Sequence, residues 1–314
     1  MLMDDKFVNR QPILSKKEIF KLYGTDDYQK FLDEKFTNKA LREALLVGTK
    51  TYFDFYTEKK SNINEKAYIT LSKYYLRMAS RPSPYGLFAG VNYRSFSEDN
   101  LLIPDNKKTI KISQEWLRNV IKKVENNQTI GSSLMLYTNR ILVEKGEICV
   151  LDKGNKKLLL NLNPSIRILL KEFRDGNTIK NVVDKYDTNI KKDLLDVIKT
   201  LLQQEFLCSE LSLSNIENNF SFSSIIKFSK NTSFYWRLIK INNLISHYER
   251  IKIGEGIVNF QKIIKEMEGI VRSDRYLDIN LKILSNNSNC LPFDKDETER
   301  EFPIFEDIFF CTYI

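Results

Sequence analysis

Two arginines four residues apart, Arg77 and Arg81, are the side chains whose type and spacing point most directly to chemistry. A guanidinium group stays charged, and its planar fork binds a phosphate or a carboxylate through two hydrogen bonds. If a helix or its continuation runs through both positions, the two groups lie on one side of it. The pair therefore indicates an anion-binding site, and the alternative is that both arginines form surface or structural ion pairs.

Other kinds of catalytic site find little support in the sequence. His247 is the one histidine, and no Gly-x-Ser-x-Gly motif accompanies it, so a serine hydrolase triad is not expected. We interpret His247 as a surface or core residue. The four cysteines are far apart and form no Cys-x-x-Cys pair, which argues against a structural zinc site and a disulfide framework. We expect no metal and a reducing, cytoplasmic location.

The composition is that of a soluble globular protein with room for two or more domains. The chain has 314 residues, of which 42% are hydrophobic and 29% charged. No run of 18 apolar residues predicts a transmembrane helix, and residues 1–17 lack the apolar core of a secretory signal. The formal charge of +8 permits a polyanionic partner such as RNA, and a general abundance of lysine is the alternative explanation.

The elements that must position the arginines are mainly helical. Residues 65–79 have helical spacing of apolar side chains, with Asn64 as the predicted N-cap. Pro82 cannot continue that helix. The other elements expected in this part of the chain are strands over 7–14 and 87–93 and helices over 41–58 and 114–124.

Residues 134–211 read as short strands followed by three helices and a last strand. The strand-like runs cover 134–137, 140–143, 148–151, 157–162 and 206–211, and the helices begin at Asn163-Pro164, at Thr178 and near 190, with Gly176 ending the first. This order predicts a small winged-helix module. Further helices over 234–249 and 256–270 and a strand over 275–283 make the predicted fold α+β, with mixed helices and sheets.

The stretch YYLRMASRPSPYGLFAGV, residues 74–91, resembles the N-terminal region of the lantibiotic dehydratases. In that family a helix ending in Arg-x-x-x-Arg-Pro-Thr/Ser-Pro-Tyr/Phe-Gly leads into Leu-Phe-Ala-Gly. The upstream FVNRQPILS and the downstream order WLRNVI, DGNTI and LLQQEFLCSEL resemble the family as well. The resemblance covers residues 5–215 well and 234–283 weakly.

The resemblance implies an activity in two steps. Glutamate moves from glutamyl-tRNA onto a Ser or Thr hydroxyl of a precursor peptide, and a second domain then eliminates glutamate to leave a dehydroamino acid. Glutamyl-tRNA is thus the implied co-substrate, and no cofactor is implied. Because an aminoacyl ester is already activated, the first site mainly has to position two bulky substrates and neutralise charge.

The resemblance also carries residue roles to this sequence. The positions that match those needed for glutamylation are Arg10, Arg77, Arg81 and Ser83, where Ser83 stands in place of the more frequent Thr. Asp278, in RYLDINL, resembles an Asp on a family strand through a short local match. Ser113 departs from the family, which often has an acidic residue before the helix that begins with Trp-Leu.

Residues 134–211 are similar to the peptide-recognition module of many enzymes that modify ribosomal peptides. The similarity implies that the leader of the substrate adds as a strand to the sheet edge and packs against the third helix. The expected surroundings are Leu158, Leu160, Leu195, Ile198 and Leu202. A DNA-binding winged helix is the competing interpretation. Because residues 190–205 hold three lysines against two aspartates and one glutamate, we expect no DNA binding.

The expected domains are 1–130, an N-terminal part of a glutamylation domain; 131–215, the leader-recognition module; 216–233, a linker; and 234–314, an incomplete continuation of the glutamylation domain. The resemblance implies that family members acting alone are far longer and carry an elimination domain. The chain is then one chain of a split enzyme completed by a second chain, a binding module without chemistry, or an inactive remnant, and whether it is an enzyme stays open.

A related interpretation of the function is a peptide aminoacyl-tRNA ligase, which adds an amino acid without eliminating it. As a partner, a membrane-associated biosynthetic complex stays open. The apolar residues 302–314 indicate either a chain that stops inside a domain or a C-terminal strand docked on the core.

Overall fold

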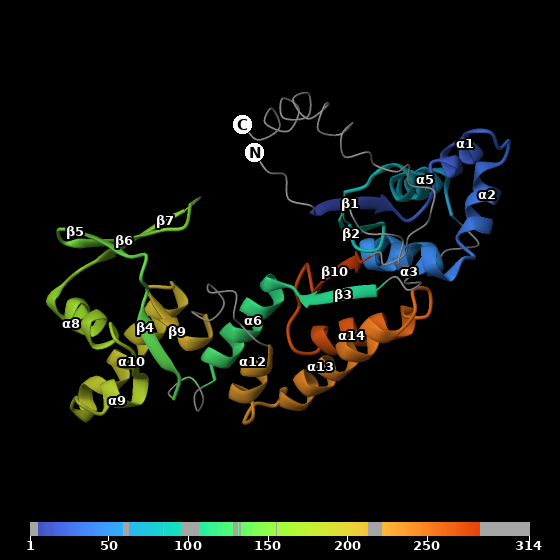
Figure 1. Ribbon diagram of the computed structural model, residues 1–314. Coiled ribbons are helices and arrows are strands. Elements are labelled where there is room, and N and C mark those ends of the chain that lie inside the picture. Colours follow the sequence, from blue (N-terminus) through green and yellow to red (C-terminus); the bar gives the residue numbers. More distant parts are fainter. Residues whose placement is uncertain are drawn as a thin grey trace. The chain divides into compact units, whose positions relative to one another are not determined.

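The structure is a computed structural model that describes residues 6–58, 63–83, 85–95, 107–127, 131, 133–154, 156–212 and 222–282 (Figure 1). The chain forms two compact units. Unit 1 comprises residues 1–111, 245–262 and 277–314, and unit 2 comprises 112–244 and 263–276. Helices and sheets are mixed in the chain, which confirms the α+β class. The two interpretations of the apolar residues 302–314 concern a segment outside the described residues.

A four-stranded sheet organises unit 1. Its strands are β1 (Lys6–Pro12), β2 (Ala89–Ser95), β10 (Leu277–Lys282) and β3 (Lys107–Ile112), in the order β1-β2-β10-β3. β1 runs antiparallel to β2, with Arg10 opposite Val91, and β10 runs parallel to β2, with Lys282 opposite the same Val91. The sheet therefore joins strands that lie about 270 residues apart in the sequence.

The helices of unit 1 that the structure describes before β2 are α1 (Lys17–Tyr23), α2 (Tyr28–Lys35), α3 (Lys39–Gly48), α4 (Lys50–Glu58) and α5 (Glu65–Ser80). Asn64 caps α5 as predicted, because its side chain accepts a hydrogen bond from the backbone N–H of Ala67 at 3.0 Å. The single helix expected over 41–58 was wrong. It breaks at Thr49, whose non-helical backbone (φ −157, ψ 84) separates α3 from α4.

The end of α5 is fixed against the sheet by backbone hydrogen bonds. Beyond β1, the N–H of Leu14 donates to the carbonyl of Met78, and the N–H of Ile13 donates to that of Phe88, both at 2.9 Å. Met78 and Phe88 are buried, as is Tyr75 on the same helix. The segment between α5 and β2 is therefore held at both of its ends, while Arg81, Pro82 and Ser83 within it are exposed.

A buried polar cluster in unit 1 is centred on Glu43. Glu43 of α3 is fully buried and pairs with Lys108 of β3 at 2.9 Å. Its carboxylate also accepts hydrogen bonds from the Tyr248 hydroxyl and from the backbone N–H groups of Gly254 and Gly256, at 2.8, 2.6 and 3.0 Å. A side chain at Gly256 would collide with the Tyr248 ring, so this close approach requires glycine.

Unit 2 begins with α6 (Gln114–Glu125), capped by Ser113. It contains a β8-β4-β9 sheet, a β5-β6-β7 sheet and several helices. The bounds are β4 (Met135–Thr138), β5 (Val143–Lys145), β6 (Ile148–Asp152), β7 (Lys157–Asn161), α8 (Pro164–Glu172), β8 (Asn177–Thr178), α9 (Ile179–Val183), α10 (Thr188–Gln203), β9 (Leu207–Ser209) and α12 (Phe222–Phe228).

Helices α13 (Tyr235–Arg250) and α14 (Ile257–Glu268) contribute residues to both units, and their predicted bounds are close to the observed ones. Trp116 of α6 is fully buried and donates from its indole to the carbonyls of Met267 and Val271, at 3.3 and 3.2 Å. Among the described residues, no helix has the length and apolar character needed to cross a membrane.

Three local predictions in unit 2 differ from the structure. Residues 140–141 form a turn, and the strand expected over 140–143 starts at Val143 instead. α8 ends at Glu172 with Phe173 as its C-cap, so Gly176, at φ +95, shapes the following turn and does not end the helix. The range 216–233, expected as a linker, contains helix α12.

Candidate functional site

Arg77 lies in the last turn of α5, where an aromatic ring supports its guanidinium group. The Cζ atom of Arg77 is 4.5 Å from the centre of the Tyr85 ring, a distance typical of a cation–π contact. The Tyr85 hydroxyl donates to the carbonyl of Gly48 at 2.9 Å. The ring is thus fastened to the end of α3, and the guanidinium group is held in place without a carboxylate.

The Nε atom of Arg77 is buried and has no hydrogen-bond partner among the described residues. Leaving a buried donor unpaired costs about 1–3 kcal/mol, so unpaired buried donors are rare in folded proteins. Where one occurs, a functional role is one of its explanations. Neither Arg77 nor Arg81 forms an ion pair with a carboxylate in the described part of the chain. The ion-pair interpretation of these two arginines finds no support in these contacts.

Arg81 is the C-cap of α5, and its backbone is extended at φ −106 and ψ 114. This conformation follows from Pro82, because the residue before a proline is driven out of the helical region. The helix therefore does not continue through Arg81, and the expectation that one helix face carries both arginines was wrong. Arg81 and Ser83 are exposed in the segment that leads to the Tyr85 turn.

Arg10 and Asp278 share one face of the unit 1 sheet. Arg10 is exposed on β1 and lies in one row with Val91 and Lys282. Residues in one row point to the same face, and Asp278 is four residues before Lys282, so it points there too. The separation of Arg10 from Asp278 is about 13 Å along the strands and about 10 Å across them, so the two side chains are not in contact.

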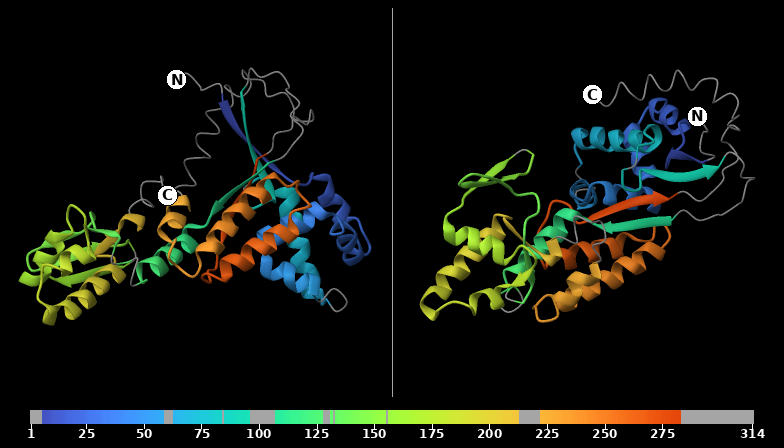
Figure 2. Two further views of the ribbon diagram at one scale, coloured as in Figure 1. Left: turned by 90° about the horizontal axis from the view of Figure 1, so that it is seen from below. Right: turned by 60° about the vertical axis from the view of Figure 1, so that its left-hand side comes forward.

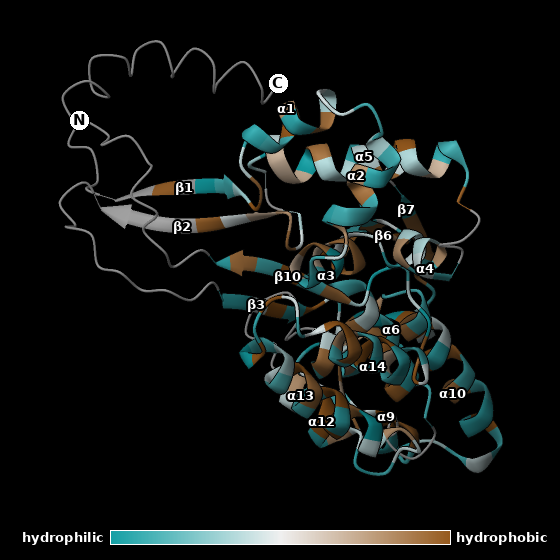
Figure 3. Cartoon of the chain, turned by 90° about the vertical axis from the view of Figure 1, so that its right-hand side faces the viewer, coloured by the Kyte–Doolittle hydropathy of each residue, from teal (hydrophilic) through white to brown (hydrophobic). Residues whose placement is uncertain are grey.

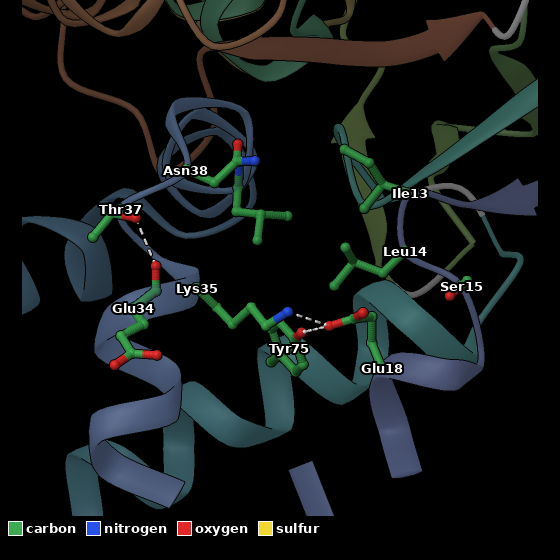
Figure 4. Close-up of a pocket in the computed structure, with 10 residues that line it drawn as sticks. Ile13, Leu14, Ser15, Glu18, Glu34, Lys35, Thr37, Asn38 and Tyr75 are labelled. Carbon is green, nitrogen blue, oxygen red and sulfur yellow. Dashed lines mark hydrogen bonds and ion pairs between the residues drawn. The ribbon is translucent and has the colours of Figure 1, made fainter. Parts of the chain in front are cut away.

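A pocket of about 470 Å³ opens between the end of β1 and helices α1, α2, α3 and α5 (Figure 4). Figure 4 shows Glu18, Lys35 and Tyr75 converging within it. Glu18 accepts hydrogen bonds from the Lys35 ammonium and the Tyr75 hydroxyl, each at 2.6 Å. The complete lining is Ile13, Leu14, Ser15, Glu18, Glu34, Lys35, Thr37, Asn38, Leu41 and Tyr75.

The charge of Glu18 is stabilised by its neighbours. Hydrogen bonds from Lys21 and Lys35 lower the pKa of Glu18 to about 2, and the Tyr75 hydroxyl contributes in the same direction. Burial and the Glu18 carboxylate raise the pKa of Tyr75. Sequence reasoning missed this group, because Glu18 and Lys35 lie in short helices that had not been predicted. None of the predicted site residues lines the pocket.

The residues expected to hold a peptide lie in two places in unit 2. Leu158 and Leu160 are half-buried on β7, an edge strand of the β5-β6-β7 sheet. They pair with the buried residues Leu151 and Cys149 of β6. Their side chains therefore lie on the covered face of the sheet, while Leu159, which is 66% exposed, points to the other face.

On α10, Leu195 and Leu202 are half-buried, whereas Ile198 is fully buried and belongs to the core. Figure 1 and the right-hand view of Figure 2 both show the β5-β6-β7 sheet set off from α10. Within the described ranges, no cluster of three or more His, Cys, Asp or Glu side chains is arranged to hold a metal ion.

Comparison with known proteins gives curated relatives that are much longer than this chain. EpiB, the epidermin biosynthesis protein of Staphylococcus epidermidis, is 25% identical over an alignment of 311 residues that covers 90% of this chain and 31% of EpiB. SpaB, the subtilin biosynthesis protein of Bacillus subtilis, is 24% identical over 88% of this chain and 28% of its own length. NisB, the nisin biosynthesis protein of Lactococcus lactis subsp. lactis, is 23% identical over 81% of this chain and 28% of its own length. This chain thus spans about a third of their length.

Two solved structures have the same fold over most of the chain. The tRNA-dependent lantibiotic dehydratase MibB from Microbispora sp. 107891 matches with a TM-score of 0.66 and 16% identity, over 89% of this chain and 29% of MibB. The glutamylation domain of TbtB, from thiomuracin biosynthesis, matches with a TM-score of 0.55 and 13% identity, over 82% of this chain and 34% of the TbtB chain.

The model of one protein family, described as the N terminus of lantibiotic dehydratases, matches residues 37–291. This range contains the α5–β2 segment with Arg77 and Arg81, the whole of the 134–211 region and β10. The match covers most of the chain and agrees with the relatives and the fold, so the chain belongs to the lantibiotic dehydratase family, as part of its N-terminal region.

Proposed function

We propose that this chain supplies part of the site that transfers glutamate from glutamyl-tRNA to Ser or Thr hydroxyls of a precursor peptide. The observation that carries the proposal is Arg77, a cation fixed on the Tyr85 ring with a buried, unpartnered Nε. Family membership supports the same chemistry, since MibB is a tRNA-dependent dehydratase and the TbtB domain is a glutamylation domain.

In this proposal, Arg77 and Arg81 hold a phosphate of the tRNA or the carboxylate of the glutamyl group. A guanidinium group suits either anion, because it can donate two parallel hydrogen bonds. Arg77 is fixed by stacking, whereas Arg81 is exposed and free to reach toward a bound substrate. The Ser83 hydroxyl adds a donor beside them, while Arg10 and Asp278 contribute from the sheet face that they share.

Residues 134–211 serve, in the same proposal, as a winged-helix module that binds the leader of the precursor peptide. The free edge of β7 offers backbone hydrogen bonds to an added strand, as in other cases of strand addition. Leu158, Leu160, Leu195 and Leu202 are partly exposed and can line apolar contacts.

The elimination step falls outside this proposal. The described residues contain no candidate group for removing glutamate. This chain also covers only about a third of the length of its relatives. We therefore propose that the remainder of the dehydratase, on a second chain or elsewhere in a longer polypeptide, completes the reaction. A leader-binding module without chemistry is the second candidate, because the β7 edge would serve it without the arginines.

The experiment that tests the proposal is reconstitution with glutamyl-tRNA and precursor peptide. Mass spectrometry should detect glutamyl adducts when the remainder of the dehydratase is present with this chain, and none when this chain is omitted. The chain alone should give no loss of water from the peptide. Adducts that form equally well without this chain would leave only the leader-binding candidate, and dehydration by the purified chain alone would contradict the proposed division.

A further inference from the structure

Helix α1 presents an uncovered face that combines aromatic rings and lysines. Phe20 and Tyr23 are each 75% exposed, although large aromatic side chains are usually buried. At 100° per residue, Lys16, Lys17, Phe20, Lys21 and Tyr23 fall within one arc of the helix, and Glu18, Ile19 and Leu22 occupy the opposite arc. Figure 3 shows apolar and polar segments interleaved along α1. We call this arc the α1 face.

The lysines of the α1 face are largely available to a partner. Lys16 and Lys17 are exposed and form no ion pair within the described residues. Lys21 pairs with Glu18 at 2.6 Å, but its side chain is still 58% exposed. Glu18 itself points inward to Lys35 and Tyr75, so the one carboxylate of the helix is neutralised on the opposite side.

This combination fits unpaired RNA better than the other candidate partners. Rings with exposed faces stack on nucleobases of any sequence, and flanking lysines attract the phosphates. Protein–protein interfaces are instead depleted of lysine at their centres. A membrane-binding helix needs a longer apolar stripe than two rings on a helix of seven residues provide.

We propose that the α1 face is a stacking surface for single-stranded RNA, such as the unpaired end of an aminoacyl-tRNA. The identity of the RNA rests on the proposed function, whereas the binding chemistry rests on Phe20, Tyr23 and the lysines. The α1 face contains none of the residues proposed for the transfer reaction, so its proposed role is to hold RNA.

The test uses the full chain and a fluorescein-labelled single-stranded RNA of roughly 12 nucleotides, which covers one typical single-strand site. Fluorescence anisotropy should show saturable binding that weakens about 5- to 100-fold in Phe20→Leu and in Tyr23→Leu, because each removes one stacked ring. Trp236→Leu is the matched control, since Trp236 is also 75% exposed but lies outside the face. Its affinity should equal that of the unmodified chain.

The lysines give a second, independent measurement. In the double variant Lys16→Gln/Lys17→Gln, the slope of log affinity against log salt should become shallower by about 0.7 for each phosphate that the variant no longer neutralises. All these positions are exposed, so melting temperatures should be unchanged, and leader binding should be unchanged as well. The rate of glutamyl transfer by Arg77→Lys, measured with glutamyl-tRNA and precursor peptide, tests the proposed function separately, because Arg77 is not part of the α1 face.

Three results would overturn the inference. The first is an RNA affinity that is the same in the unmodified chain, Phe20→Leu and Tyr23→Leu, or no RNA binding at all. The second is tighter binding of the unmodified chain to phosphatidylglycerol vesicles than to RNA, abolished in the same two variants, which would assign the face to a membrane. The third is self-association that both leucine variants abolish, which would assign it to a second copy of the chain.

Discussion

Arg77 is the residue on which the proposed function rests most heavily. Its position within Arg-x-x-x-Arg-Pro-Ser-Pro-Tyr-Gly suggested anion binding, and Tyr85 of the same motif forms the ring on which the guanidinium group rests. The motif thus encodes both the cation and its support. Stacking on a ring leaves the outer donors of an arginine available, which an ion pair would not.

At the residue scale, the Glu18 cluster predicts a dependence of stability on pH. The folded pKa of Glu18 is about 2, below its usual 4.5, so its contribution to stability is present above pH 4.5 and is lost as the pH falls toward 2. Allowing for solvent screening, we expect a loss of about 1–2 kcal/mol over this range. Urea unfolding at several pH values measures it, and the loss should be smaller by that amount in Glu18→Gln. An identical pH profile in both proteins would contradict the assignment.

The buried pair of Glu43 and Lys108 predicts a larger effect on stability. In Glu43→Gln the Lys108 ammonium would stay buried without its counter-charge, and breaking such a pair costs about 3–5 kcal/mol. Urea unfolding at pH 7 measures this change, and Asp54→Asn is the matched control because Asp54 forms a partly exposed pair with Lys50. We expect the control to change stability by less than about 1 kcal/mol. Equal effects in the two variants would argue against the buried network.

At the element scale, β7 is the strand on which leader binding depends in the proposed function. Truncating Leu160→Ala should weaken the binding of a labelled leader peptide by about tenfold, because it removes apolar surface next to the added strand. Ile168→Ala on α8 is the matched control, since Ile168 is 53% exposed and lies outside β7. Isothermal titration, together with a melting curve for each variant, makes the comparison. Leader affinity that is unchanged in Leu160→Ala would remove β7 from the peptide site.

The elements that the sequence predicted best are those with a strong local signal. Helix α5 has helical spacing and the Asn64 cap, and it was predicted within a residue. The Asn163-Pro164 signal gave the start of α8, although not its end. Helices α1 and α2 were missed because each has only seven or eight residues and packs through long-range contacts such as Tyr75 to Glu18. The pocket that they line was missed with them.

The break between α3 and α4 illustrates what a one-dimensional pattern leaves out. Apolar spacing continues from Leu41 to Phe55, and nothing in the local sequence requires an interruption. In the fold, Gly48 lies so close to the Phe88 ring that an added side chain would reach within 2.9 Å of it. That contact joins residues 40 positions apart, and the Gly48 carbonyl also accepts the hydrogen bond from Tyr85, whose ring supports Arg77.

At the scale of the whole chain, the pairing of strands could not be read from the sequence. β1, β2, β10 and β3 come from distant segments, and their order in the sheet decides that Arg10 and Asp278 share a face. The resemblance identified those two residues from motif matches alone, without placing them. The family model and the solved structures confirm the family and the mixed fold, while the roles of the individual residues remain for experiment.

The central claim is that Arg77 acts in glutamyl transfer, and the most direct test is the rate of glutamyl adduct formation by the complete dehydratase carrying Arg77→Lys. Lysine keeps the charge but loses the fork, so the loss of a charged hydrogen bond should slow adduct formation about ten- to a hundredfold. The matched control is Arg237→Lys, at an exposed arginine paired with Glu266. It should be as fast as the unmodified enzyme. Normal adduct formation by a folded Arg77→Lys enzyme would contradict the account.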